Sequence, residues 1–172
     1  MDDEFLCFKD QSFDLIISNL NLHFINDILR NLIQIKNCLK KDGIFIATFF
    51  GGQTLKELRE VFYQIEIENY NAISPRIIPF IDVKDAGMLM QKAGFKDTVS
   101  EIEKIEIHFD NPLKLLRDLK NMGESNILFS RSKKFFTKKM LFSLEELYQK
   151  LYKTSENKIL ASFEIITLTG KK

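Results

Sequence analysis

Hydrophobic and polar residues follow one another along this chain in blocks that predict an α/β fold. Two apolar runs, Phe13–Asn19 and Ile44–Phe50, have the continuous hydrophobicity of buried strands. Between them, residues 28–39 place apolar side chains at helical spacing after Asn26 and Asp27, either of which can cap a helix. Asp42-Gly43 is expected to end this helix. Two buried strands joined by a helix form a βαβ unit, so we expect the two strands to be parallel.

The next part of the chain predicts two more helices separated by an irregular segment. Thr54 is expected to cap a helix that continues to about Asn69. Residues 74–81 contain two prolines and should be irregular or extended. Asp82 opens a further helix, which should end before Gly94.

The C-terminal part predicts antiparallel strands and two helices. Thr98–Phe109 alternates apolar and charged residues, which is typical of a half-buried antiparallel strand. A helix should start at Pro112 and end near Gly123, and Lys133–Lys153 holds a basic cluster followed by an amphipathic helix. Ile159–Thr169 closes the chain as a strand. The whole pattern predicts an α/β layer fold with parallel strands first and antiparallel strands last.

Size and charge fit one globular domain without a charged partner. The chain has 172 residues, a net charge of +1 and 45% hydrophobic residues. This balance gives no reason to expect nucleic acid as a partner. The N-terminus is acidic and no apolar run approaches the ~20 residues of a membrane span, so we expect a cytoplasmic protein without a membrane-spanning segment. The two cysteines, Cys7 and Cys38, are expected to be free thiols in a reducing compartment, and we expect no metal site.

Glycine usage excludes one class of site near the N-terminus. The chain has 7 glycines and the first is Gly43, so residues 1–42 contain no glycine-rich phosphate or nucleotide loop. A doubly wound sheet binds its ligand at the carboxyl ends of its strands, which here are Asn19–His23 and Phe49–Gly52. His23 is a candidate base or substrate-orienting group, or else a packed ring. Gly51 and Gly52 allow a ligand close to the backbone, or else simply form a turn.

Three further features have both a functional and a structural interpretation. Arg76 lies in the proline-containing segment and is a candidate contact for an acidic or peptide substrate, or a salt-bridged anchor of the loop. His108 falls at a polar position of a predicted strand, where a surface role is expected. The basic cluster suggests nucleic acid by its composition, but the net charge favours a solvated loop. Its members are Lys133, Lys134, Phe135, Phe136, Lys138 and Lys139.

Several short motifs carry a resemblance to a known family. An acidic start is followed by Phe13-Asp14, and later segments read SNLNLHF (18–24), GGQTLKELR (51–59), SPRIIPF (74–80), KAGF (92–95) and NMGESN (121–126). The chain resembles the second half of a class I S-adenosylmethionine-dependent methyltransferase. Within that superfamily it is most similar to the branch of mitochondrial complex I assembly factors described as methyltransferase-like arginine hydroxylases, which is related to the malonyl-acyl carrier protein methyltransferase of biotin synthesis.

The resemblance implies roles for individual residues. Asp2, with Asp3 beside it, matches the carboxylate that contacts the adenine of S-adenosylmethionine, although an acidic terminus is also simply solvated. The cofactor would also contact Ser18, Asn19 and Leu20. Gly51, Gly52, Arg76, Glu124 and Asn126 become candidate substrate-side residues, while Gly123 and its neighbours also fit a plain helix end.

The resemblance further implies a partial Rossmann-like fold that lacks the first three strands of the family. Residues 1–53 would be the remainder of the cofactor-binding sheet, and residues 54–172 the substrate-side helices and strands. The intact relative would act as a methyltransferase or arginine hydroxylase in complex I assembly. The alternative is a non-enzymatic interaction fragment or an inactive remnant. Expected partners are a respiratory-complex subunit as substrate, a separate N-terminal half, or a second copy joined through an exposed sheet edge.

Overall fold

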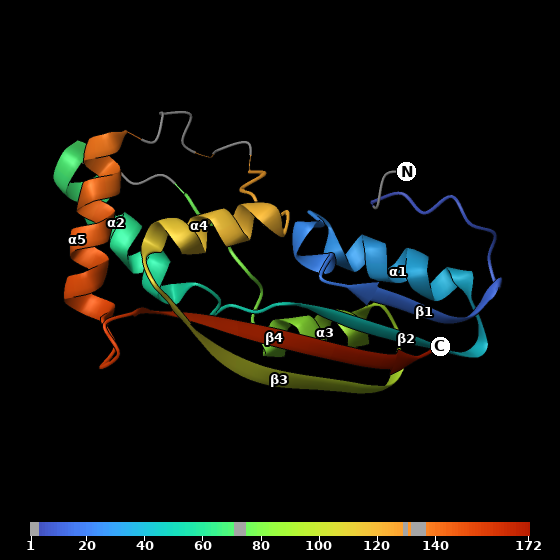
Figure 1. Cartoon of the computed structure of the whole chain (residues 1–172). Coiled ribbons are helices and arrows are strands. Elements are labelled where there is room, and N and C mark those ends of the chain that lie inside the picture. Colours follow the sequence, from blue (N-terminus) through green and yellow to red (C-terminus); the bar gives the residue numbers. More distant parts are fainter. Residues whose placement is uncertain (1–3, 71–74, 129–130, 132–136) are drawn as a thin grey trace. The chain divides into compact units, whose positions relative to one another are not determined.

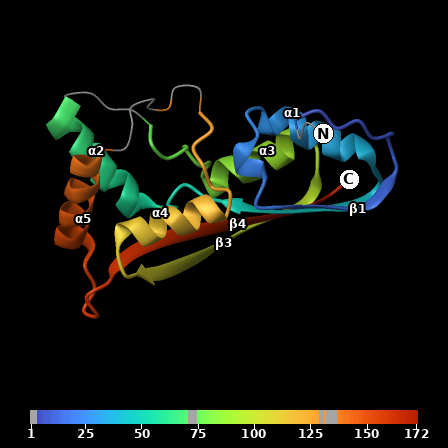
Figure 2. The same cartoon turned by 45° about the horizontal axis from the view of Figure 1, so that its top comes forward.

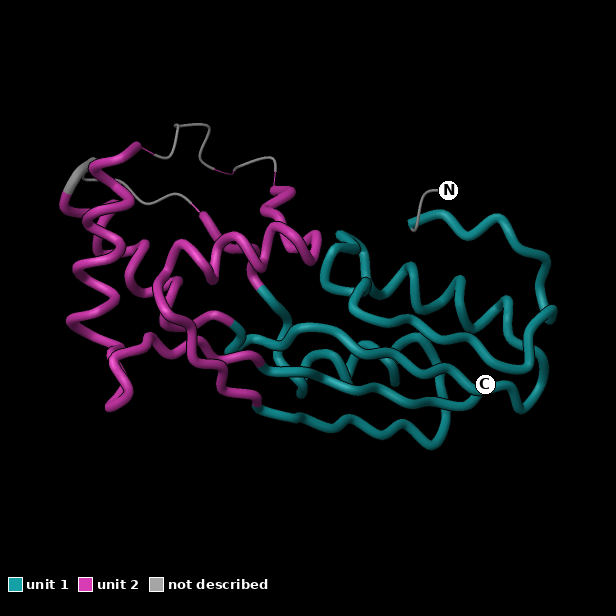
Figure 3. The backbone as a smooth tube through the Cα atoms, in the orientation of Figure 1, with its two compact units in different colours: residues 1–54, 80–104, 164–172 teal, residues 55–79, 105–163 magenta. Residues whose placement is uncertain are grey.

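The computed structural model describes residues 4–70, 75–128, 131 and 137–172 (Figure 1). The chain divides into two compact units (Figure 3). The first contains residues 1–54, 80–104 and 164–172, and the second contains residues 55–79 and 105–163. Both units are discontinuous in sequence, whereas the sequence predicts a single boundary between residues 53 and 54. The predicted division into a cofactor-binding sheet and a substrate side stays a prediction.

Four strands form one sheet in the order β1-β2-β4-β3. They are β1 (Phe13–Asn19), β2 (Leu39–Phe50), β3 (Lys96–Phe109) and β4 (Ile159–Lys171). β1 and β2 are parallel, with Ile17 opposite Ile46, and β2 and β4 are antiparallel, with Ala47 opposite Leu168. The predicted α/β fold with parallel strands first and an antiparallel strand last is therefore confirmed.

One face of the sheet in the first unit is covered by helices. The short η1 (Leu22–Phe24), α1 (Ile28–Cys38) and α3 (Val83–Lys92) lie on the same side, and α1 packs on α3 (Figure 2). The strands and helices share a core of fully buried side chains. Its members include Leu22, Leu32, Leu39, Phe45, Ala47, Phe49, Met90, Ile166 and Leu168.

The opposite face of the same sheet carries apolar side chains that remain in water. Leu15 and Ile17 of β1 are 48% and 64% exposed, and Ile44 of β2, the partner of Leu15, is 43% exposed. The continuous apolar run of β1 therefore does not correspond to a strand buried on both faces. Several exposed apolar side chains on one face of a sheet are unusual.

The first helix is shorter than its apolar pattern indicates. Asp27 caps α1 by accepting a hydrogen bond from the Arg30 N–H at 2.9 Å, as expected. The helix ends at Cys38 rather than at Asp42, because Leu39 is buried in the sheet opposite Phe13. The register of β2 then shifts before Ile44, and Asp42 takes a φ of 63° in this irregular part.

The second unit is built around three helices, α2 (Lys56–Tyr70), α4 (Pro112–Asn121) and α5 (Lys138–Tyr152). α2 and α4 both pack against α5. Each of the later helices has a side-chain cap, since Asn111 accepts from the Lys114 N–H and Thr137 from the Met140 N–H. The core of this unit includes Leu58, Val61, Ile65, Leu115, Leu144 and Tyr148.

The last predicted elements are all present, with one difference in burial. β3 was expected to be half-buried, but Val99, Ile102, Ile105 and Ile107 are all 38–51% exposed. β3 lies at the edge of the sheet, where one neighbour is missing, so its apolar side chains have fewer surfaces to pack on. None of the described helices is long and apolar enough to cross a membrane.

Candidate functional site

The carboxyl ends of β1 and β2 lie side by side and are tied together by polar contacts. The Thr48 hydroxyl lies 2.5 Å from Oδ1 of Asn19, to which it donates, and the N–H of Leu20 donates to the Thr48 carbonyl at 2.8 Å. Leu20 has a φ of 50°, so the chain turns away from the sheet directly after Asn19. The turn leaves Asn19 exposed, with Ser18 and Leu20 half-buried beside it. The three predicted cofactor contacts therefore lie together at one strand end.

His23 lies in η1, just beyond this turn, among three aromatic rings. Its ring centre is 4.2 Å from that of Phe24, 5.1 Å from that of Phe50 and 5.8 Å from that of Phe80. Burial lowers the pKa of His23 from 6.5 to about 4, because the charged imidazolium loses its hydration there. At neutral pH the ring is uncharged, and a conjugate acid with so low a pKa makes His23 a weak base.

Gly51 and Gly52 differ in what surrounds them. The Gly51 N–H donates to the Glu164 carbonyl at 2.7 Å, and a Cβ on Gly51 would lie 2.5 Å from the Glu164 carboxylate and 2.9 Å from Ile166. A Cβ on Gly52 would meet nothing closer than 3.8 Å, the distance to the Phe80 carbonyl oxygen. A side chain at position 51 would therefore force the Glu164 or Ile166 side chain to move, whereas position 52 has room for one.

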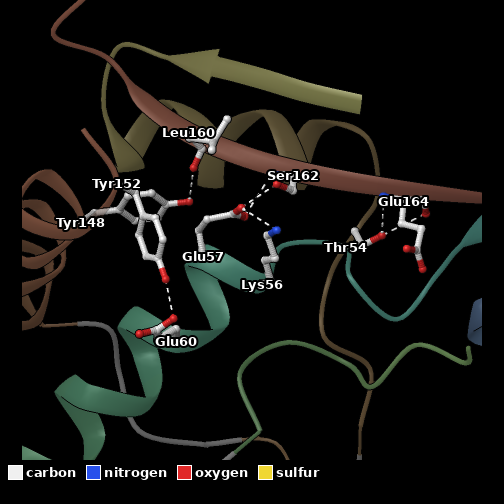
Figure 4. Close-up of polar contacts among 9 residues, drawn as sticks. All are labelled: Thr54, Lys56, Glu57, Glu60, Tyr148, Tyr152, Leu160, Ser162 and Glu164. Carbon is white, nitrogen blue, oxygen red and sulfur yellow. Dashed lines mark hydrogen bonds and ion pairs between the residues drawn. The ribbon is translucent and has the colours of Figure 1, made fainter. Parts of the chain in front are cut away.

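Thr54 fixes the loop that these glycines begin, and it does so through the neighbouring strand. Its hydroxyl donates to the Glu164 carbonyl at 3.0 Å and accepts the Glu164 N–H at 3.0 Å (Figure 4). The expectation that Thr54 caps α2 is wrong, because the helix starts two residues later, at Lys56. The loop is thus attached rigidly to β4.

Glu164 is a site residue that sequence reasoning missed. Only 4% of the residue is exposed, although it is a carboxylate in a strand whose other buried side chains, such as Phe163 and Ile166, are apolar. Oε1 accepts one long hydrogen bond, from the Gln53 N–H at 3.4 Å. The signal in the sequence is the single acidic residue between Phe163 and Ile165, at a position that alternation places on the buried face.

In the second unit, Arg76 forms a buried ion pair. Its Nε lies 2.7 Å from Oε1 of Glu66, and the guanidinium carbon lies 5.6 Å from the centre of the Phe62 ring. The Arg76 side chain is 12% exposed and that of Glu66 is 3% exposed. Through these contacts Arg76 anchors the loop that contains it. A substrate-binding role for Arg76 stays a prediction.

Asn126 joins two of the family-like segments. Its Nδ2 donates to the Pro75 carbonyl at 2.7 Å, and its Oδ1 accepts from the Leu128 N–H at 3.0 Å. The segment around MGESN is therefore attached to the segment around SPR. Gly123 has a φ of 85° and ends α4, where the Glu124 N–H donates to the Leu119 carbonyl. Burial raises the pKa of Glu124, whose side chain is half-buried.

A separate polar network connects α2, α5 and β4 in the second unit (Figure 4). The Glu57 carboxylate accepts from the N–H of Ser162 at 3.0 Å and from its hydroxyl at 2.5 Å. Tyr148 donates to the Leu160 carbonyl at 2.8 Å, and Tyr152 donates to Glu60. Burial raises the pKa of Tyr148 and of Tyr152, so both phenols stay protonated and act as donors. The network serves to hold two helices on a strand.

Comparison with known proteins gives the family. The family model described as a methyltransferase domain matches residues 1–47. The Rickettsia prowazekii (strain Madrid E) protein RP459, which carries methyltransferase in its name, is 44% identical over 163 residues, covering 95% of this chain and 71% of RP459. The chain belongs to the methyltransferase family. This confirms the predicted superfamily.

Longer relatives narrow the likeness within the methyltransferases. The mitochondrial arginine-hydroxylase NDUFAF5 is 38% identical in Mus musculus and 37% identical in Homo sapiens, each over 171 residues and 99% of this chain. The chain spans about half the length of these relatives, 50% and 49%. A malonyl-[acyl-carrier protein] O-methyltransferase of Gallionella capsiferriformans is 28% identical over 165 residues, 96% of this chain and 54% of that protein. Both branches named from the motifs are thus found.

Solved structures show the same fold. A methyltransferase-named protein of Bacillus halodurans has a TM-score of 0.57 at 16% identity, covering 100% of this chain and 69% of that one. The YcgJ protein of Bacillus subtilis has a TM-score of 0.56 at 15% identity, covering 99% and 68%. At such identity the likeness concerns the fold alone, and it confirms the predicted methyltransferase-like α/β sheet.

The other residues singled out in the sequence lie on the surface, in the core or outside the described residues. Asp2 and Asp3 lie outside the described residues, as do four members of the basic cluster, residues 133–136. Lys138 and Lys139 are exposed at the start of α5, and His108 is exposed on β3. Cys7 is an exposed free thiol and Cys38 a buried one. Within the described ranges, no three His, Cys, Asp or Glu residues gather as metal ligands.

Proposed function

We propose that this chain supplies the acceptor side of an S-adenosylmethionine-dependent protein that modifies an arginine side chain of a protein substrate. The observation that carries the proposal is the match over 99% of the chain to the arginine-hydroxylases. The geometry supports it, because the matched segments build the strand ends where ligands of doubly wound sheets bind. A respiratory-complex subunit is the proposed substrate, as the family resemblance of the motifs implies.

The residues at the end of β1 suit one edge of a cofactor site. Asn19 presents an exposed amide at the carboxyl end of a parallel strand, and Leu20 bends the chain so that Ser18 and Asn19 stay accessible. Bound S-adenosylmethionine would supply an electrophilic methyl group on its sulfonium. His23 and its surrounding rings would shield that group from water, as a neutral apolar wall. Residues 1–42 hold no glycine, so we expect binding by this chain alone to be weaker than micromolar.

The experiment adds a separate N-terminal half. The chain is mixed with the part of mouse NDUFAF5 that precedes the matched region, and S-adenosylmethionine is titrated in a calorimeter. We expect micromolar binding by the mixture, weakened in Asn19→Ala and unchanged in Gln91→Ala, an exposed residue of α3. An arginine peptide should then exchange one hydrogen for the methyl group of S-adenosylmethionine or, where molecular oxygen and a reductant are also supplied, gain the mass of one oxygen atom. Absence of both binding and mass gain in the mixture would exclude the proposal.

A non-enzymatic role in assembly is the second candidate, and the exposed sheet face favours it. Leu15, Ile17 and Ile44 leave a row of apolar side chains in water, and β1 is at the end of the sheet order. Such a surface stabilises a complex with the separate half or with a second copy. The association state is measured by sedimentation of the chain alone and of the chain mixed with the separate N-terminal half. A monomer under both conditions, with Ile17→Lys behaving like the parent chain, would contradict an assembly role.

A further inference from the structure

Helix α5 carries a row of neighbouring side chains on a side that does not face the core of its unit. The row recurs at intervals of three and four residues, which places its members on one face of a helix. We call it the α5 stripe, and its members are Lys138, Leu141, Phe142 and Glu145. The buried residues of the same helix are Met140, Leu144 and Tyr148. Phe142 is 71% exposed, the largest value among the large apolar side chains that the structure describes.

An open depression of about 440 Å³ lies along this stripe, between α5 and the start of α4. Its walls are the four residues of the α5 stripe together with Asn111 and Leu113. Leu113 is 42% exposed, so both helices leave apolar side chains in water beside the depression. A single exposed apolar residue is ordinary, but a depression with an apolar floor and charged residues at its rim is typical of a protein–protein contact.

The two ends of the α5 stripe carry opposite charges. Lys138 lies in the first turn of α5, and Glu145 lies about 10 Å further along the helix axis. Neither of them forms an ion pair with another described residue. Their neighbours three and four positions away within α5 carry no opposite charge, so the helix itself does not pair them. Within the described part of the chain, both charges therefore remain uncompensated.

We propose that the α5 stripe binds the same stripe of a second copy of this chain, with the two helices antiparallel. A twofold axis that passes between Leu141 and Phe142 places Lys138 of each copy opposite Glu145 of the other. The same axis places Leu141 of each copy opposite Phe142 of the other. The stripe is thus complementary to itself in charge and in apolar character. Parallel helices would instead bring like charges face to face, which disfavours that arrangement.

The antiparallel contact uses both the depression and the start of the helix. The Phe142 ring of each copy enters the depression of the other beside Leu113 and loses its exposure to water there. Glu145 of each copy reaches the first turn of the other α5, which has no acidic residue of its own and where the helix dipole favours a negative charge. Two short stretches of helix bury a small area, so the dimer is reversible and depends on concentration.

The test is sedimentation equilibrium of the chain at low ionic strength, where surface ion pairs are screened least, and at concentrations up to about 1 mM. Lys138→Glu and Glu145→Lys each create two like-charge contacts in the dimer and should weaken it at least about tenfold. The double variant restores opposite charges and should dimerise within about threefold of the parent chain. Lys84→Glu, the same change at an exposed lysine in the first turn of α3, is the control and should have no effect.

Three outcomes of this comparison would overturn the proposal. They are a parent chain that stays monomeric at every concentration, single variants that associate like the parent chain, and a double variant that is as weak as the single ones. A monomeric chain would leave the depression to a different protein or to none.

A second pair of variants separates this dimer from association through the exposed sheet face. Phe142→Ser should weaken the dimer at least about tenfold and keep the melting temperature of the parent chain, because the ring is exposed in the single chain. Ile17→Lys, on the sheet face, should dimerise like the parent chain. Loss of association in Ile17→Lys with none in Phe142→Ser would assign the contact to the sheet and overturn the proposal.

Discussion

Oε1 of Glu66 lies 2.7 Å from Nε of Arg76, and both side chains are almost fully removed from water. The pair connects α2 with the segment that contains Pro75 and Pro79. The Phe62 ring lies against the guanidinium, which adds a cation–π contact. A charged pair in this setting is sensitive to the loss of either member, because the remaining charge stays buried without its partner.

Replacing Arg76 should therefore lower stability strongly. We expect Arg76→Ala to reduce the free energy of unfolding by about 3–5 kcal/mol, the usual loss when one member of a buried pair is removed. Urea unfolding measures this, and the double variant Arg76→Met with Glu66→Leu should recover most of the loss. Unchanged stability of Arg76→Ala would favour the substrate-binding interpretation instead of the anchor.

Gly51 and Gly52 provide a matched pair for substitution. Gly51→Ala would place a methyl group 2.5 Å from the Glu164 carboxylate and 2.9 Å from Ile166, so something in the loop or in β4 must move. We expect a loss of about 1–3 kcal/mol, which is typical of overpacking. Gly52→Ala has open space and should stay within about 0.5 kcal/mol of the parent chain. Thermal unfolding compares the two variants. Equal losses of stability would contradict the conclusion that only position 51 is tightly packed.

The local sequence predicted the elements well, because hydrophobic spacing and capping residues act over short distances. Asp27, Asp82 and Asn111 each cap the helix that follows them. Where prediction failed, a distant residue competed for a local group. Leu39 joins the sheet opposite Phe13 rather than continuing its helix.

The site depends on pairings that no local pattern contains. Thr54 binds the backbone of Glu164, 110 residues away, and Asn126 binds Pro75, 51 residues away. Family-like motifs indicated that Gly51, Arg76 and Asn126 matter, but not which groups they contact. Glu164 could be found only after the antiparallel register of β4 was known, since that register places it across from Gly51.

The side-chain amide of Asn126 should hold two loops together. Removing its amide in Asn126→Ala leaves the Pro75 carbonyl and the Leu128 N–H without their Asn126 partner. We expect this to lower the free energy of unfolding by about 1–3 kcal/mol. Amide hydrogen exchange should rise in residues 75–79 and 124–128. Ser125→Ala, an exposed neighbour, serves as the control and should leave exchange unchanged. If amide exchange in both segments of Asn126→Ala is as slow as in the parent chain, other contacts hold these loops.

His23 should make the fold sensitive to mild acid. Its pKa is about 4 in the folded chain against 6.5 ordinarily, so the unfolded chain takes up a proton first as the pH falls. Stability due to the neutral ring is therefore complete above pH 6.5 and lost progressively towards pH 4. His23→Phe keeps an aromatic ring beside Phe24 and Phe50 but cannot titrate, so its loss of stability over that interval should be smaller. Because carboxylates also titrate in this pH interval, the quantity to compare is the difference in unfolding free energy between the parent chain and His23→Phe.

The measurement is urea unfolding of both chains at several pH values from 7 to 4. The gap in unfolding free energy should change steadily in favour of His23→Phe as the pH falls through this interval. His108→Gln, which alters the exposed histidine of β3, should follow the parent chain. If the gap between the parent chain and His23→Phe is independent of pH, His23 is hydrated in solution, and the aromatic wall that we assign to the cofactor site is open to water.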